Sequence, residues 1–110
     1  MARFITRHHE YRSLFPCEFY LRSEHFLAAV TSSDAEFSLG ITIGKNIGKA
    51  HQRNKLKRRI KAFIRSNEQL LPDGFKLNLI ARVGAAQLSW PSLCEQLHQI
   101  IQSLKDRRLK

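Results

Sequence analysis

The sequence AHQRNKLKRRIKAFIR, which covers residues 50–65, decides how this chain folds. If it forms a helix, with 100° between successive residues, one side is apolar and carries Leu56, Ile60, Phe63 and Ile64. The opposite side is polar or basic, and its members are Asn54, Arg58, Lys61 and Arg65, with Lys55 and Lys57 on the flanks. The pattern therefore predicts an amphipathic helix that packs its stripe on a core and presents positive charge to its surroundings.

Acidic residues are absent from a longer stretch around this helix. No carboxylate occurs between Glu36 and Glu68, whereas nine lysines and arginines do: Lys45, Lys49, Arg53, Lys55, Lys57, Arg58, Arg59, Lys61 and Arg65. Like charges four residues apart repel one another, so such a helix favours a polyanionic partner that neutralises it. On charge alone, an ordinary solvated face or a nuclear-import patch at residues 55–61 remains an alternative.

Size and composition support a single nucleic-acid-binding domain. The chain has 110 residues, of which 43% are hydrophobic, and 19 basic residues against 9 acidic ones give a net charge of +10. These values suit one packed domain with a polyanionic ligand better than a binder of small acidic substrates. No apolar run is long enough to span a membrane, and the N-terminus lacks the apolar core of a secretory signal. We therefore expect a cytoplasmic protein.

The remaining pattern predicts an α+β sandwich of order α-β-β-α-β-α. We expect a short helix from Thr6 to about Phe15, strands over 25–31, 37–43 and 76–83, and a final helix capped by Ser89. The first two strands are expected to pair in antiparallel fashion. Helices on one face of a small mixed sheet would bury every apolar stripe. Residues 1–110 then form one domain, with a frayed basic tail at 105–110.

The alternation within the strands predicts which side chains are buried. In the last strand Leu77, Leu79, Ala81 and Val83 can enter the core, whereas Lys76, Asn78 and Arg82 are expected at the surface. The sheet face away from the helices would then carry small or polar groups, namely Ser38, Gly40, Thr42, Asn78 and Arg82. The final helix has its own stripe, made of Leu93, Leu97, Ile100, Ile101 and Leu104.

Catalytic and metal-binding motifs are missing from the sequence. The segment GITIGKN, residues 40–46, has the wrong glycine spacing for a phosphate-binding loop and lacks Ser or Thr after Lys45. The five histidines are scattered, and Cys17 and Cys94 lack the spacing of zinc ligands. No pair of carboxylates is placed by a motif for acid–base work. We therefore expect no metal bound by the protein and no catalysis by the polypeptide alone.

The segment KNIGKAHQRNKLKRRIKAFIR, residues 45–65, resembles the signature of the bacterial ribonuclease P protein family. That signature has Arg-Asn-Arg, an apolar residue and Lys-Arg, and the matching positions are Arg53, Asn54, Lys55, Leu56, Lys57 and Arg58. The resemblance extends over most of the chain, including FSLGITIGK (37–45), LPDGFKLNLIARVGAA (71–86) and the final helix. Lys55 and Asn46 depart from the family pattern, which usually has arginine and lysine there.

The resemblance implies a small basic subunit that assists a catalytic RNA. Together they would remove the 5′ leader from precursor tRNA and broaden the range of substrates, with magnesium held mainly by the RNA, which performs the hydrolysis. The protein would dock its basic helix on that RNA and present a cleft, between its first helix and the sheet, to the single-stranded leader. The family's β-α-β crossover is left-handed, against the usual hand of such connections. No obligate protein partner is implied.

Carried over by resemblance, two sets of residues would bind RNA. The signature helix and the loop before it supply Lys45, Lys49, Arg53, Asn54, Lys55, Lys57, Arg58, Arg59, Lys61 and Arg65. The leader cleft would contain Tyr11, Phe15, Arg12, Lys76, Asn78 and Arg82. Aromatic rings stack on unpaired bases of any sequence, which suits a variable leader. Tyr11 and Phe15 could equally be plain packing residues.

Two features leave alternatives open. Ala28 and Ala29 occupy a strand that offers an aromatic residue in some family members, so cleft stacking is either weaker here or carried by Tyr20 or Phe26 instead. The rival class of function is a structural binder, such as a ribosome-associated or double-stranded RNA-binding protein, which would share the charge. A DNA-binding function is disfavoured because no helix-turn-helix spacing is present.

Overall fold

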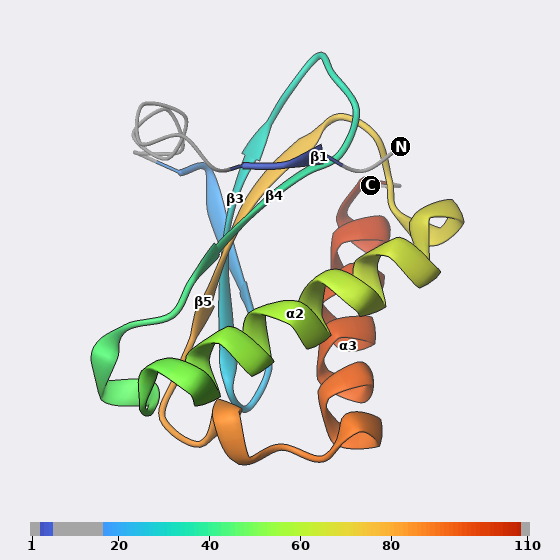
Figure 1. Cartoon of the computed structure of the whole chain (residues 1–110). Helices are drawn as coiled ribbons and strands as arrows, with labels where there is room; N and C mark the ends of the chain where they lie inside the picture. The colour runs from blue at the N-terminus through green and yellow to red at the C-terminus, as the bar shows by residue number, and fades with distance from the viewer. Residues whose placement is uncertain (1–2, 6–16, 109–110) are drawn as a thin grey trace.

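The computed structural model describes residues 3–5 and 17–108, and they form a mixed sheet with two long helices (Figure 1). The strands are β1 (Arg3–Phe4), β2 (Phe19–Arg22), β3 (Phe26–Ser32), β4 (Ser38–Thr42) and β5 (Phe75–Ala81). The helices are α2 (Ala50–Ser66) and α3 (Trp90–Arg108), with short 3-10 turns η1 (Lys45–Ile47), η2 (Glu68–Leu70) and η3 (Ala85–Gln87). The α+β class is confirmed, whereas the helix predicted from Thr6 to about Phe15 lies outside the described residues.

The strands lie in the order β1-β4-β5-β3-β2, which corrects the predicted pairing. β5 runs parallel to β4 and antiparallel to β3, so the expected antiparallel pair of β3 with β4 is wrong. The loop after β3 explains the difference, because it bonds to the turn before β5. Ser33 N–H donates to Gly74 O (2.8 Å), and Gly74 N–H donates to Ala35 O (3.0 Å). Gly74, at φ +91°, makes the turn that precedes β5, which lies between β4 and β3.

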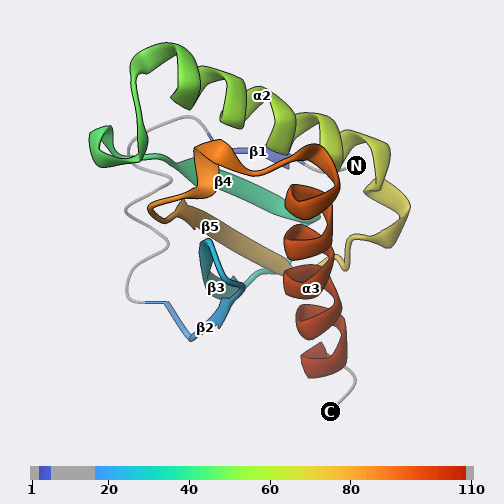
Figure 2. The same ribbon diagram turned by 90° about the horizontal axis from the view of Figure 1, so that it is seen from below.

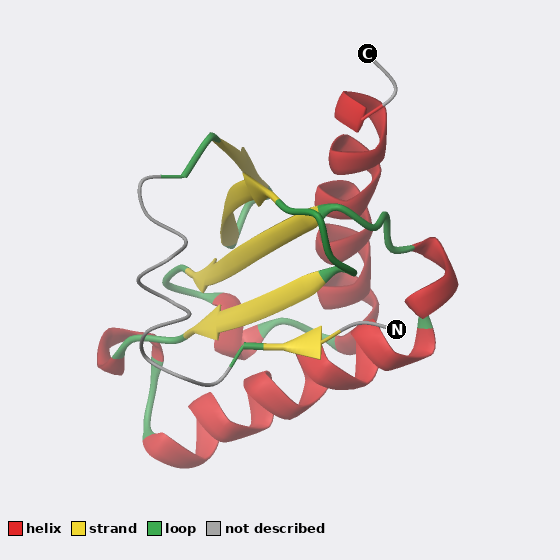
Figure 3. Ribbon diagram, turned by 90° about the horizontal axis from the view of Figure 1, so that it is seen from above, coloured by secondary structure: helices red, strands yellow, loops and turns green. Residues whose placement is uncertain are grey.

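Both helices cover the same face of the sheet, as the views from opposite ends show (Figures 2 and 3). The chain passes from β4 through α2 into β5, so a crossover joins parallel neighbours as the family resemblance implies. Its left-handed sense stays a prediction. Within the described residues, no helix is both long and apolar enough to cross a membrane.

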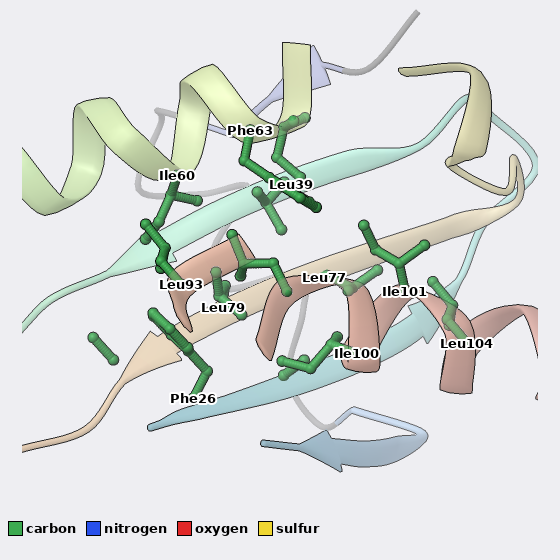
Figure 4. Close-up of a cluster of buried hydrophobic side chains, with 14 of the residues drawn as sticks. Phe26, Leu39, Ile60, Phe63, Leu77, Leu79, Leu93, Ile100, Ile101 and Leu104 are labelled. Atoms are coloured by element: carbon green, nitrogen blue, oxygen red, sulfur yellow. The ribbon is translucent and has the colours of Figure 1, made fainter. Parts of the chain in front are cut away.

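The core lies between the helices and the sheet, and it contains both predicted helical stripes (Figure 4). Ser89 begins α3 as predicted, since its Oγ accepts a hydrogen bond from Ser92 N–H at 3.3 Å. α3 continues to Arg108, so residues 105–108, for which the sequence predicts fraying, are helical. Every stripe residue is buried: Leu56, Ile60, Phe63 and Ile64 of α2, and Leu93, Leu97, Ile100, Ile101 and Leu104 of α3.

The second face of the sheet, away from the helices, differs in part from the prediction. Neighbouring residues across the strands share a face, so Tyr20, Ala29, Asn78 and Gly40 form one row there. Asn78 is only 4% exposed, which contradicts its predicted place at the surface. Val83 is 70% exposed rather than buried, because β5 ends at Ala81 and the alternation no longer applies.

Candidate nucleic-acid interface

The first turn of α2 presents positive charge without compensation. It contains no acidic residue, so the positive end of the helix dipole faces the approach from Lys45 and Lys49, both exposed. Local hydrogen bonds fix this approach: Lys49 N–H donates to Gln52 Oε1 (2.9 Å), and Arg53 Nε donates to Gly48 O (3.2 Å). Such an arrangement attracts phosphate.

One flank of α2 faces the edge of the sheet and groups half of the predicted RNA-binding residues. Arg53, Asn54 and Lys57 line a groove with Ile41 and Ile43, which follow one another on the same side of β4 and the loop after it. Two turns farther along, Lys61 Nζ and Arg65 Cζ lie 5.3 and 5.5 Å from the centre of the Phe4 ring. We call this set the sheet-edge flank, and it consists of Arg53, Asn54, Lys57, Lys61 and Arg65.

The electrostatics of the sheet-edge flank favour an anionic ligand. The pKa of Lys61 is lowered, first by partial burial of its ammonium group and then by the charges of Lys57 and Arg65. Lysine side chains spaced four residues apart repel one another in the free protein. Phosphate groups placed against this flank would remove that repulsion, so the arrangement is suited to a polyanion.

Arg59 lies away from the sheet-edge flank, on the side of α2 that meets α3. Its Nη1 donates to Leu88 O at 2.9 Å, and its Cζ is 5.8 Å from the centre of the Trp90 ring. Lys55 is exposed one turn earlier on the same side, and Arg58 is exposed on the crest of the helix. The structure therefore divides the predicted signature set between two flanks instead of gathering it at one site.

The residues predicted for the leader cleft lie partly on the second face of the sheet. Lys76 is half-buried there and Arg82 is exposed just beyond the end of β5. Asn78 is occupied within the fold, because its Oδ1 accepts a hydrogen bond from Thr42 Oγ1 at 2.8 Å. The other three predicted members, Tyr11, Arg12 and Phe15, lie outside the described residues.

Tyr20 adds an exposed aromatic ring to this second face, whereas Phe26 is fully buried in the core. Of the two aromatic alternatives, only Tyr20 can therefore meet a ligand. Its pKa is raised, chiefly by a hydrogen bond with Cys17. Arg22, two residues on in β2, shares the face and was missed from the sequence. The alternation of Phe19 and Leu21 with Tyr20 and Arg22 could have revealed it.

The sequence matches the family model described as Ribonuclease P over residues 2–105. The chain belongs to the ribonuclease P protein family. The ribonuclease P protein component of Carboxydothermus hydrogenoformans is 33% identical over 108 residues, which cover 94% of this chain and 92% of the relative. That of Desulfosudis oleivorans is 30% identical over 97 residues, covering 87% of this chain and 80% of the relative.

Solved ribonuclease P proteins also share the fold. That of Staphylococcus aureus matches with a TM-score of 0.84 at 20% identity, covering 96% of this chain and 97% of the other. That of Thermotoga maritima matches with a TM-score of 0.82 at 24% identity, covering 92% and 96%. The family resemblance found in residues 45–65 is thus confirmed, together with the fold class.

Metal ligands are the remaining question for a ribonuclease P protein. Across residues 3–5 and 17–108, no three His, Cys, Asp or Glu side chains are grouped so as to hold a metal ion. Cys17 and Cys94 are free thiols, each half-buried. What the described surface offers is charge and aromatic rings, which are the means of binding RNA.

Proposed function

We propose that this chain is the protein subunit of ribonuclease P, acting in the cytoplasm with a catalytic RNA. The protein binds that RNA and the 5′ leader of precursor tRNA, and the pair removes the leader by endonucleolytic cleavage. Magnesium is held mainly by the RNA, which carries the chemistry, and the polypeptide alone is not catalytic. The sheet-edge flank carries this proposal, because four cations and an amide line one side of a helix that lacks carboxylates.

The sheet-edge flank is the proposed docking surface for the catalytic RNA. Phosphate contacts supply most of the affinity in such complexes, and arginine offers a planar fork that matches phosphate oxygens. Arg53 is already oriented by its bond to Gly48 O, so less side-chain freedom is lost on binding. Asn54 adds a neutral donor and acceptor beside it. The groove with Ile41 and Ile43 can accept the edge of a sugar or a base.

The second face of the sheet is the proposed leader surface. Tyr20 supplies a ring for stacking, and Lys76, Arg82 and Arg22 supply charge around it. Stacking and phosphate contacts read no sequence, which suits leaders that differ between tRNAs. Helices α2 and α3 cover the opposite face, so leader and catalytic RNA would meet different sides of the protein.

Reconstitution tests the proposal. Purified protein is mixed with a bacterial ribonuclease P RNA at low magnesium, and cleavage of a 5′-extended precursor tRNA is followed, with each component also tested alone. We expect cleavage at the mature 5′ end to be stimulated only when both are present. Tight RNA binding without any stimulation would refute the subunit function and favour a structural RNA binder.

The leader surface is tested separately with Tyr20→Ala. Loss of one stacked base costs about 1–3 kcal/mol, so the affinity for precursor tRNA should fall by roughly fivefold or more while that for mature tRNA is kept. Val83→Ala, which also trims an exposed apolar side chain, is the matched control and should change neither affinity. Equal losses for both tRNAs would contradict a leader contact at Tyr20.

A further inference from the structure

Trp90, the single tryptophan of the chain, is held in a defined position at the surface. It is the first residue of α3, and its side chain is 44% exposed. The guanidinium of Arg59 lies 5.8 Å from the centre of the indole ring, within the range of a cation–π contact. Arg59 is itself fixed, because its Nη1 donates to Leu88 O at 2.9 Å. An indole ring is thus exposed beside an immobilised cation, away from the sheet-edge flank.

The surroundings of Trp90 are aromatic and basic. Trp90, Cys94 and His98 recur every four residues on the side of α3 that meets α2, where the His98 ring packs edge-on against Phe63 at 4.9 Å. Burial raises the pKa of the Cys94 thiol, and the charge of Arg59 partly offsets this.

Acidic residues occur on α3 but not on α2. Lys55 precedes Arg59 by one turn on α2 and is exposed. The carboxylate nearest in sequence is that of Glu95, which lies about 140° round α3 from Trp90. Glu95 borders a groove with Glu24, Leu88, Ser92 and Gln99, so this acidic groove reaches Leu88 but lies on the other side of it from the α2 flank. The side of Trp90 that faces α2 is therefore basic, through Arg59 and Lys55, and complements a negatively charged partner there.

We propose that Trp90, supported by Arg59, stacks on an unpaired nucleobase of the catalytic RNA. This inference rests on the proposed ribonuclease P function and adds a second RNA contact on the opposite flank of α2. An indole ring offers a large apolar face to a base, and a neighbouring guanidinium can pair with the adjoining phosphate. The leader is not the source of that base, because it would lie on the second face of the sheet, behind both helices.

Intrinsic fluorescence tests the contact directly, since all tryptophan emission of the chain comes from Trp90. The full chain is titrated with a bacterial ribonuclease P RNA and, separately, with a single-stranded leader oligonucleotide. Stacking should quench the emission and shield the indole from acrylamide when the RNA binds, whereas the oligonucleotide should leave both signals unchanged. Unchanged emission and acrylamide access in a saturated RNA complex would overturn the proposal, as would the same response to the leader alone.

Substitutions give an independent measurement. Trp90→Ala should weaken binding of the catalytic RNA by about fivefold or more, with the salt dependence of binding unchanged because no ionic contact is lost. Arg59→Lys keeps the charge but loses the fork, and it should reproduce part of that loss. Val83→Ala is the matched control, and thermal unfolding of each variant checks the fold. An affinity within about twofold of wild type for Trp90→Ala would overturn the proposal.

The outcomes distinguish failure of the Trp90 contact from failure of the proposed ribonuclease P function. If the RNA binds and stimulates cleavage but Trp90 does not respond, the stacking contact is wrong and the subunit function stands. If the RNA does not bind at all, both fail together.

Discussion

Replacing Lys57 and Lys61 together with glutamine is expected to weaken RNA binding without weakening the fold. Arg53, Lys57, Lys61 and Arg65 follow one another at intervals of four along α2, which creates three like-charge pairs. Each pair destabilises a helix by about 0.2–0.5 kcal/mol, and the double substitution removes all three. Glutamine has nearly the helix propensity of lysine, so the backbone contributes little to the change.

One favourable contact is lost in the same variant. Lys61 Nζ lies 5.3 Å from the Phe4 ring centre, a contact worth about 0.5–1 kcal/mol at an exposed site. Arg65 remains over that ring at 5.5 Å and retains part of the contribution. The relieved repulsion and the lost contact nearly balance, and the free energy of unfolding should change by no more than about 1 kcal/mol, with a gain favoured.

The pH dependence of stability tests independently whether the positive charge of Lys61 destabilises the folded protein. The pKa of Lys61 is lower in the folded protein than in the unfolded chain, so the unfolded state binds more protons between those two values. Stability of the native protein should therefore rise as pH climbs through the folded pKa, below the ordinary lysine range. The glutamine variant should lose that rise, which urea unfolding at a series of pH values would show.

RNA binding by the double glutamine variant should weaken, although its fold is kept. Two lost phosphate contacts reduce the slope of log affinity against log salt by about 1.4–1.8. Lys105→Gln is the control, because it removes the same type of charge from the part of α3 that packs near β2, at the other edge of the sheet. An unchanged slope in the double variant, or a large loss of unfolding free energy, would show that these lysines serve the fold rather than the RNA.

Three further predictions concern the fold around α3. Gln96→Ala should lower the free energy of unfolding by about 1–3 kcal/mol in urea titration, because Gln96 Oε1 accepts from His25 N–H at 2.8 Å and this part-buried donor is left unpaired. Gly84→Ala should cost about 1–3 kcal/mol in the same assay, since φ is +99° and a Cβ would lie 2.8 Å from His25 Cδ2. With Cys17 changed to serine, alkylation of Cys94 by iodoacetamide should be slower than that of a free thiol and should accelerate as pH rises through a raised pKa; a rate equal to that of a model peptide would contradict this.

The helices could be predicted from the sequence because burial repeats locally with their period. In α2 the apolar positions three and four residues apart are the buried ones, and the same holds for α3. Strand pairing could not be predicted in this way, since it depends on segments far apart in the chain. The bonds of Ser33 and Ala35 to Gly74 place β5 in the middle of the sheet, and no local pattern announces them.

The edge strands and the polar network were missed for different reasons. β1 could not be predicted, because two residues are too few to show any period. β2 could have been predicted, because its four residues alternate clearly between half-buried and exposed. Gln96 occupies an ordinary polar position of a helix, yet it is buried and joins the turn after β2 to α3 through Ser23 and His25. Its role depends on a tertiary contact that a sequence pattern does not contain.

The signature helix was predicted as one binding surface, but its geometry separates the residues. Arg53 and Lys57 lie toward the sheet edge, whereas Arg59 lies on the other side of the apolar stripe. The helical period alone could have shown this division. The period could not have shown that Leu88 and Trp90 contact Arg59 on the side of α2 that meets α3, because those contacts depend on how α3 packs.

The second face of the sheet shows why polarity does not imply exposure on a central strand. Asn78 lies in a row between Ala29 and Gly40, with neighbouring strands on both edges of β5. A polar group in that position must be paired, and it accepts the hydroxyl hydrogen of Thr42, which is itself exposed. Asn78 therefore acts by orienting Thr42, and an RNA strand crossing this face would meet the threonine before the amide. Alternation along β5 correctly predicted the face of Asn78, but the depth of its burial could not be read from that alternation.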